Sequence, residues 1–242
     1  MINLSIFKAG KYDFNFNKKS LVMGILNVTP DSFSDGGLFN EPEKAVKRAF
    51  EIQSLGADII DIGAQSTRPG FKKISSDEEW ARLCPVLEKL NGTLNIPISI
   101  DTFYPQVAEK SLQMGASIIN DVTGFEDKKM FEVAGKSDCG IVIMFSGDCK
   151  NMKNFFKNKL AEAQKYGISK ERICLDPGIG FLETRNQDRF VVNNLENFKI
   201  DEVACLVGLS RKRFIAELCE NGSNIERLPG TIAANTIAIQ KG

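Results

Sequence analysis

Polar side chains capable of hydrogen bonding and acid–base chemistry stand at or just after short apolar runs along this chain. The set is Asn27, Asp61, Asp101, Asn120, Asp121, Asp176 and Ser210. The chain contains no histidine, which removes the commonest general base and a common metal ligand. Any acid–base catalysis must therefore use carboxylates, lysine or a bound substrate.

Two polar loops follow the first two of these runs. The first, NVTPDSFSDGG over residues 27–37, has almost nothing to bury. The second, GAQSTRPGFKK over residues 63–73, contains Arg68, whose guanidinium suits phosphate oxygens. Because loops of this kind fold over ligands, we expect the first to act as a lid.

Seven apolar runs predict the strands that must position these residues. They lie within residues 21–27, 54–63, 97–101, 112–124, 140–145, 172–176 and 203–210. Short, nearly all-apolar runs are typical of parallel strands buried on both faces. Helices are predicted between them, among them residues 42–54, 77–90 and 105–114, the second opening with a capping box from Ser76 to Glu79.

The alternation of strands and helices predicts an α/β fold, a (β/α)8 TIM barrel, with a doubly wound open sheet as the alternative. In such a barrel the strand ends and the loops after them gather at one face, where catalytic residues lie. The N-terminal segment MINLSIFKAGKYDFNF predicts a β-hairpin around Gly10-Lys11. No linker divides the chain, so we expect one domain over residues 1–242.

An internal repeat predicts that the eighth βα unit is missing. TIAIQKG at residues 236–242 resembles residues 50–56 and 111–115, each of which is followed at once by alanine and a strand. We therefore expect a C-terminally incomplete barrel, which stops where strand eight should start.

The composition of the chain limits the classes of partner that it is expected to bind. The chain has 242 residues with 31 basic and 31 acidic side chains, so no net field draws it to nucleic acid or to anionic lipid. We expect a small-molecule substrate and no membrane partner, since no apolar run reaches the length of a membrane span. The six cysteines show no C-x-x-C spacing, which favours the reducing cytoplasm.

Six motifs give a specific resemblance. LVMGILNVTPDSFSDGG, DIGAQSTRPG, SIDT, ASIINDVTG, LDPGIGF and LVGLSRK occur in this order. Together they resemble the dihydropteroate synthase family from about Leu21 to the last residue. The resemblance implies a TIM barrel that condenses 6-hydroxymethyl-7,8-dihydropterin diphosphate with 4-aminobenzoate in folate biosynthesis. It also implies sulfonamide competition at the aminobenzoate site and a homodimer.

The same resemblance assigns roles to individual residues. The pterin contacts are expected to be Asp101, Asn120, Asp176 and Lys212, with Gly208 also binding substrate. Phe181, which follows the DPG turn, is expected to stack on the pterin face, with a place in the core as the alternative. Asn27 matches the family's Mg²⁺ and diphosphate contact, and Arg68 would approach the diphosphate. Ser210 and the helix it caps would meet the aminobenzoate carboxylate, while the ring would be walled by Phe33, Thr67 and Pro69. The catalytic set is then Asn27, Arg68, Asp101 and Lys212.

The sequence also departs from the family. Gln65 stands where relatives usually have glutamate, Phe145 stands where they have a histidine, and nothing matches their final Arg-x-His-Asp segment. Two alternatives therefore stay open: a pterin-binding protein without turnover, and a pterin-dependent methyltransferase domain. The second would not need the SFSDGG, STRPG and SRK segments.

Overall fold

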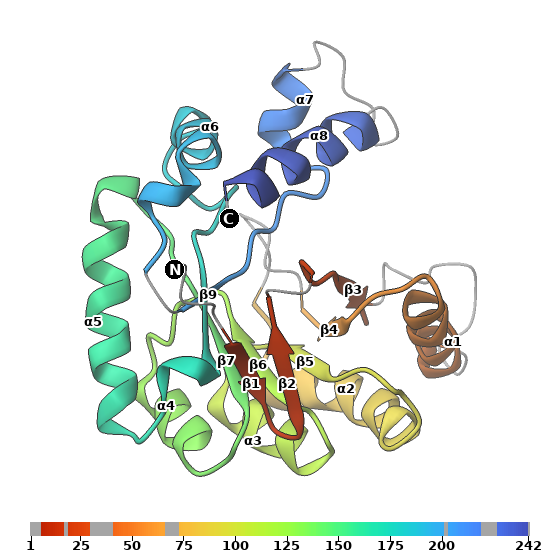
Figure 1. Cartoon of the computed structure of the whole chain (residues 1–242). Helices are drawn as coiled ribbons and strands as arrows, with labels where there is room; N and C mark the ends of the chain where they lie inside the picture. The colour runs from red at the N-terminus through yellow and green to blue at the C-terminus, as the bar shows by residue number, and fades with distance from the viewer. Residues whose placement is uncertain are drawn as a thin grey trace.

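Seven parallel strands form a curled sheet at the centre of the molecule (Figure 1). The computed structural model describes residues 6–16, 19–29, 41–65, 73–200, 203–218 and 227–241. The strands of the sheet are β3 (Met23–Asn27), β4 (Ile59–Gly63), β5 (Ile98–Asp101), β6 (Ile118–Asp121), β7 (Gly140–Met144), β8 (Ile173–Asp176) and β9 (Ala204–Cys205).

The spatial order of the strands follows their order in the chain, from β3 to β9. A doubly wound sheet requires a reversal of this order at a switch point, so that alternative is wrong. The sheet is that of a TIM barrel, with β3 and β9 at its two edges, and the described residues contain no eighth parallel strand.

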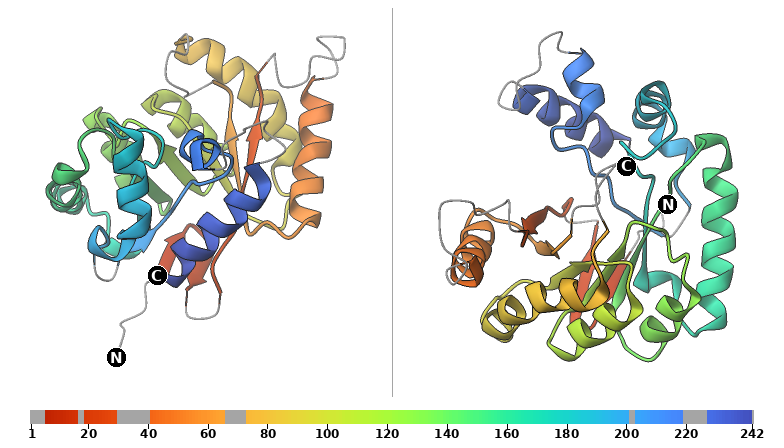
Figure 2. Two further views of the ribbon diagram at one scale, coloured as in Figure 1. Left: turned by 90° about the horizontal axis from the view of Figure 1, so that it is seen from above. Right: turned by 180° about the vertical axis from the view of Figure 1, so that it is seen from behind.

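Helices surround this sheet on the outside (Figure 2). They are α1 (Glu41–Ser54), α2 (Ser76–Leu90), α3 (Pro105–Gln113), α4 (Lys128–Gly135), α5 (Met152–Lys165), α6 (Arg185–Asn193), α7 (Arg213–Leu218) and α8 (Arg227–Gln240). Short 3-10 turns occur at Cys149–Asn151, Lys170–Arg172 and Leu195–Asn197. Among the residues that the structure describes, no helix is both long and apolar enough to cross a membrane.

The N-terminal hairpin is confirmed as β1 (Ile6–Ala9) paired antiparallel with β2 (Tyr12–Asn15). It packs where the parallel strands begin: a Cβ on Gly140, the first residue of β7, would lie 2.5 Å from the Phe7 ring. Phe7 and Ala9 share a buried cluster with Ile59 and Ile118, the first residues of β4 and β6. The hairpin therefore lies at the amino-terminal end of the barrel, opposite the strand ends that carry the candidate site.

The start of α2 differs from the expected one. The capping box at Ser76 is wrong, because the cap of α2 is Ser75, whose Oγ accepts the Glu78 N–H at 3.1 Å. Glu79 does not reach back to the cap, since its side chain is turned into the protein and bonds Gln65.

The last expected strand, within residues 203–210, is reduced to Ala204–Cys205. Its partner β8 ends at Asp176 and is followed by Pro177, which has no N–H to continue the ladder. The chain after β9 therefore leaves the sheet as a loop that leads to α7.

Candidate active site

Asp101 and Asn120 lie side by side on neighbouring strands, and Asp61 lies on the next strand, β4. In the register of the sheet, Gly63 of β4 is opposite Asp101 of β5, which is opposite Asn120 of β6. Asp61 is buried below them, where it accepts hydrogen bonds from Ser99 Oγ at 2.6 Å and from Asn120 Nδ2 at 3.1 Å. Asp61 thereby fixes the orientation of the Asn120 amide.

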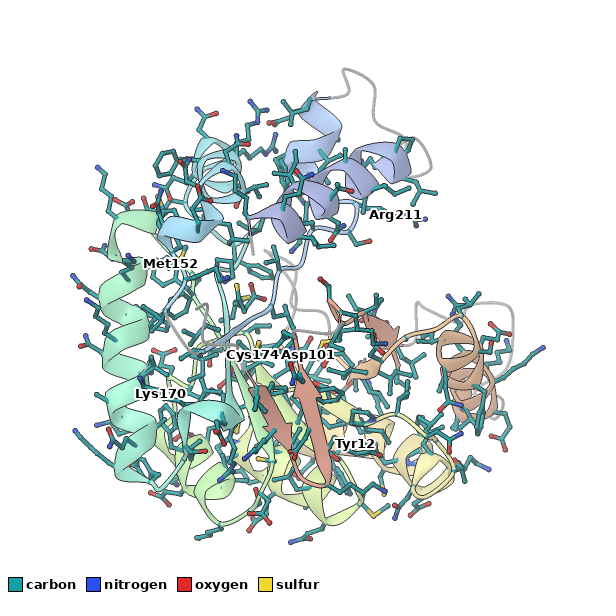
Figure 3. All side chains as sticks on the ribbon, in the orientation of Figure 1. Tyr12, Asp101, Met152, Lys170, Cys174 and Arg211 are labelled. Carbon is teal, nitrogen blue, oxygen red and sulfur yellow. The ribbon has the colours of Figure 1, made fainter. Side chains whose placement is uncertain are left out.

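The Asp101 carboxyl is a buried group with an unmet hydrogen bond. Among the described residues, its Oδ1 has no partner. Gly63 leaves it room, because a Cβ there would come within 3.3 Å of Asp101 Oδ2. Burial raises the pKa of Asp101 well above its usual range, and the neighbouring carboxyls of Asp61, Glu79 and Asp121 raise it further. Such a group is suited to a ligand that brings its own donors, since an unpaired buried polar atom costs about 1–3 kcal/mol. Figure 3 shows Asp101 in the interior of the ring of strands and helices.

Asp176 ends β8 and holds the turn that follows it. Its Oδ1 accepts the Gly178 N–H at 2.8 Å, and Gly178 has φ of 67°, a conformation that favours glycine. Burial raises the pKa of Asp176 to about 6, against the lowering effects of that hydrogen bond and of the Lys212 charge. The side chain therefore combines a turn-forming role with a charge that faces Lys212.

Lys212 enters this group from the loop before α7. Its Nζ lies 4.7 Å from the centroid of the Phe181 ring, within the range of a cation–π contact. The lysine also packs on Gly180, where a Cβ would come within 2.9 Å of Lys212 Cδ. Burial lowers the pKa of Lys212, whereas Asp176 and Asp188 raise it. By contrast, the neighbouring Arg213 is exposed.

Asn27 ends β3 with an exposed side chain, in register with Gly63. The described residues contain no cluster of three or more acidic, cysteine or histidine side chains able to cage a metal ion. One amide oxygen at an open strand end nevertheless fits Mg²⁺ that takes most of its ligands from phosphate oxygens and water.

Gln65 is a buried link between β4, α2 and the segment that begins at Lys73. Its Nε2 donates to Glu79 Oε2 at 3.1 Å, and its Oε1 accepts the Ile74 N–H at 3.0 Å. The Tyr104 hydroxyl donates to the Ile74 carbonyl at 2.5 Å, so both polar backbone groups of Ile74 are held by side chains. An amide at position 65 can donate to a carboxylate and accept an N–H at once, which an ionised glutamate cannot do.

Three positions singled out from the sequence differ from expectation or lie outside the site. Ser210 is exposed, and α7 begins only at Arg213, so the expectation that Ser210 caps that helix is wrong. Asp61 lies two residues before the end of β4 and is not a strand end. Phe145 is buried and packs edge-on against Phe155 and Phe156, which places it in the core.

Four expected site residues, Phe33, Thr67, Arg68 and Pro69, lie outside the described residues. Gly208 is half-buried in the loop between β9 and α7, and no atom lies within 4 Å of where its Cβ would be.

The structure adds polar residues that the sequence did not single out for the site. Ser99 alternates with apolar neighbours inside β5. Glu79 was expected only as part of a capping box, and Asp188 lies on α6 with no motif around it. Period-two alternation within β5 is a signal that places Ser99 on the same face as Asp101. Nothing in the sequence indicates that Glu79 and Asp188 turn inward.

Comparison with known proteins identifies the family to which this chain belongs. The family model described as pterin binding enzyme matches residues 23–242. A dihydropteroate synthase of Clostridium beijerinckii is 43% identical, with 97% of this chain and 90% of that protein covered. The chain belongs to the dihydropteroate synthase family. It is therefore an enzyme, a transferase of the type that family comprises.

Solved structures of the dihydropteroate synthase family agree with this assignment. The Clostridium difficile enzyme, determined in the presence of pteroic acid, has a TM-score of 0.90 and 42% identity, with 95% of this chain and 90% of that chain covered. The Xanthomonas albilineans enzyme with 4-aminobenzoic acid has a TM-score of 0.92 and 33% identity, with coverage of 99% and 90%.

Proposed function

We propose that this chain joins the amine of 4-aminobenzoate to the methylene carbon of 6-hydroxymethyl-7,8-dihydropterin diphosphate. A carbon–nitrogen bond forms, the carbon–oxygen bond to diphosphate breaks, and dihydropteroate, diphosphate and a proton are released. The observation that carries the proposal is the buried group of Asp101, Asn120 and Asp61 with its unmet acceptor, in a chain of the dihydropteroate synthase family.

Asp101, Asn120, Asp176 and Lys212 would bind the pterin. A pterin edge presents several N–H donors and a carbonyl, which match two carboxyls, an amide and an ammonium. Because each buried group left unpaired costs about 1–3 kcal/mol, such a pocket selects for the pterin edge. Phe181, with Lys212 Nζ over its ring, would support the pterin face.

Departure of diphosphate leaves positive charge on the pterin methylene. Carboxylates beside the ring would stabilise that charge electrostatically, best where water is excluded. Pterin N–H groups that donate to the Asp101 carboxyl would lower its raised pKa and so favour the ionised form. Asp101 and Asp176 would serve this role, which is supported by their positions at strand ends and by their buried carboxyl groups. The pterin N–H groups would supply the donors that the Asp101 carboxyl lacks.

The leaving group would be held at the β3 edge of the sheet by Asn27 and Arg68. Mg²⁺ bound there would supply Lewis acidity to the departing diphosphate oxygens. Asn27 would contribute one oxygen to it, consistent with its exposed amide at the end of β3. The Arg68 guanidinium would bind phosphate oxygens through paired N–H donors.

The aminobenzoate ring would lie between Phe33, Thr67 and Pro69. Its carboxylate would meet the hydroxyl of Ser210, which is exposed in the loop before α7. Sulfonamides would compete at this subsite. A Yersinia pestis dihydropteroate synthase has been solved with a sulfonamide drug complex, and it is 32% identical to this chain with a TM-score of 0.88.

We also propose a homodimer that works in the cytoplasm. The helices α6, α7 and α8 contact one another and line an open, mostly apolar pocket of about 240 Å³, which includes Val192, Phe214 and Ile237. Exposed apolar side chains on the same helices include Phe190, Leu218 and Ile232, a surface that a second copy would cover. The five described cysteines are free, which suits a reducing compartment.

Pterin affinity of Asp101→Asn tests the proposal. Calorimetric titration with the pterin diphosphate should show at least tenfold weaker binding, about 1.4 kcal/mol, because an amide places a donor where the ligand also donates. The matched control is Asp127→Asn on the exposed cap of α4, where asparagine caps equally well. Unchanged affinity in Asp101→Asn, with circular dichroism like wild type, would remove Asp101 from the pocket.

A further inference from the structure

Asp188 is a buried carboxylate behind Lys212. It lies on α6 and is 4% exposed. Its Oδ1 accepts the Gly180 N–H at 2.7 Å. Gly180, with φ of 89°, is the residue on which the aliphatic part of Lys212 packs. One carboxylate oxygen thus fixes the backbone surface that supports the lysine.

The charge of Asp188 also acts on Lys212. Among the described residues, the charged groups that face the lysine are Asp176 from β8 and Asp188 from α6. Burial raises the pKa of Asp188, whereas the Gly180 N–H and the charges of Lys212 and of Arg185, at the start of α6, lower it. A half-buried ammonium loses hydration, so its charged form depends on these two carboxylates.

We propose that Asp188 is a positioning residue for substrate binding, which keeps Lys212 charged and seated on Gly180 beside Phe181. The inference rests on the proposed role of Lys212 in binding the pterin. Asp188 would act on the site only through Lys212 and Gly180. A residue of α6 would therefore contribute to substrate binding, in addition to the residues at the strand ends.

Two substitutions separate the hydrogen bond from the charge. Asp188→Asn retains an oxygen that accepts the Gly180 N–H but removes the negative charge. Asp188→Ala removes both. If Asp188 only anchors the Gly180 turn, asparagine restores wild-type behaviour at every pH. If its charge supports Lys212, asparagine fails as the pH rises, because Lys212 then loses its proton at lower pH.

The first experiment measures kcat/KM for the pterin diphosphate from pH 6 to pH 10. For Asp188→Asn we expect the alkaline limb to move down by at least about one pH unit, with up to about a tenfold loss near pH 9 and little loss at pH 6.5. Asp188→Ala should lose activity at every pH, and Asp127→Asn should keep the wild-type profile. An Asp188→Asn profile equal to wild type, or lowered evenly at every pH, would overturn the inference.

The second experiment follows Lys212 itself, without turnover. Competitive labelling of lysines with trace acetic anhydride, read by mass spectrometry, gives the pKa of Lys212 in wild type and in Asp188→Asn. A lower pKa of Lys212 in the variant supports the inference, and an unchanged value refutes it. Lys212→Ala tests the proposed function separately: if pterin affinity survives that substitution, Lys212 is not a pterin contact, whatever the labelling shows.

Discussion

Replacing Glu79 by glutamine should change how the stability of this protein depends on pH. Glu79 is 0% exposed, and Gln65 Nε2 donates to its Oε2, while its Oε1 has no hydrogen-bond partner among the described residues. Burial raises the pKa of Glu79 from its ordinary 4.5 to about 7, against the lowering effects of Thr102 and Arg82.

The sign follows from proton linkage. The folded carboxyl binds its proton more tightly than the unfolded one, so the stabilising contribution is fully present below pH 4.5 and is lost as the pH rises through 7. Between pH 5.5 and pH 8 these two pKa values correspond to a loss of about 2 kcal/mol. Glutamine cannot ionise, so this loss is absent in the variant. The substitution also removes one of the charges that raise the pKa of Asp101, which acts in the same direction.

The assay is urea unfolding of the ligand-free protein at several pH values between 5.5 and 8. The unfolding free energy of Glu79→Gln, taken relative to wild type, should rise by about 2 kcal/mol across this range. Glu132→Gln, on the exposed face of α4, is the matched control for the loss of one carboxylate. Parallel pH dependences in Glu79→Gln and wild type would refute the reasoning, because they would mean that Glu79 is not held protonated by burial.

Two further substitutions test the turns that shape the site. Gly178→Ala should lower the unfolding free energy by at least about 2 kcal/mol in urea titrations, because its Cβ would overlap the Phe145 carbonyl oxygen and its φ of 67° is strained for alanine. Gly167→Ala shares the positive φ but has open space, so an equal loss there would show that the overlap is unimportant. Asp121→Asn should lose about 1–3 kcal/mol in thermal unfolding, because the carboxylate accepts the N–H groups of Thr123 and Phe125 and the Thr123 hydroxyl. A loss of pterin affinity with unchanged stability would instead make Asp121 a ligand contact.

The barrel was predictable because its strands are short, nearly all apolar and separated by helical segments. The same pattern placed Asp101 and Asp176 at the ends of their strands and Asn120 one residue before the end of β6, because the carboxyl ends of the strands in such a barrel meet at one face. Ser210 was misplaced because the sequence does not show where pairing stops. Pairing between β8 and β9 stops early because Pro177, the residue after β8, has no N–H to donate.

Residues on helices were harder to assign from sequence. Ser75 and Ser76 are adjacent serines that both precede acidic residues, and only the backbone geometry decides which one caps α2. Glu79 and Asp188 resemble the surface acids of any amphipathic helix. Their burial depends on partners elsewhere in the chain. Glu79 bonds Gln65, which is 14 residues away. Asp188 accepts from Gly180, which is 8 residues away, and also faces Lys212.

The most direct test is turnover by the protein itself. The purified chain is incubated with 6-hydroxymethyl-7,8-dihydropterin diphosphate and Mg²⁺, with and without 4-aminobenzoate, and both diphosphate and dihydropteroate are measured. The account predicts that the two products appear in equal amounts, only with 4-aminobenzoate present, and that Asp101→Asn is strongly impaired. Tight pterin binding without either product would contradict it and would favour a pterin-binding protein without turnover.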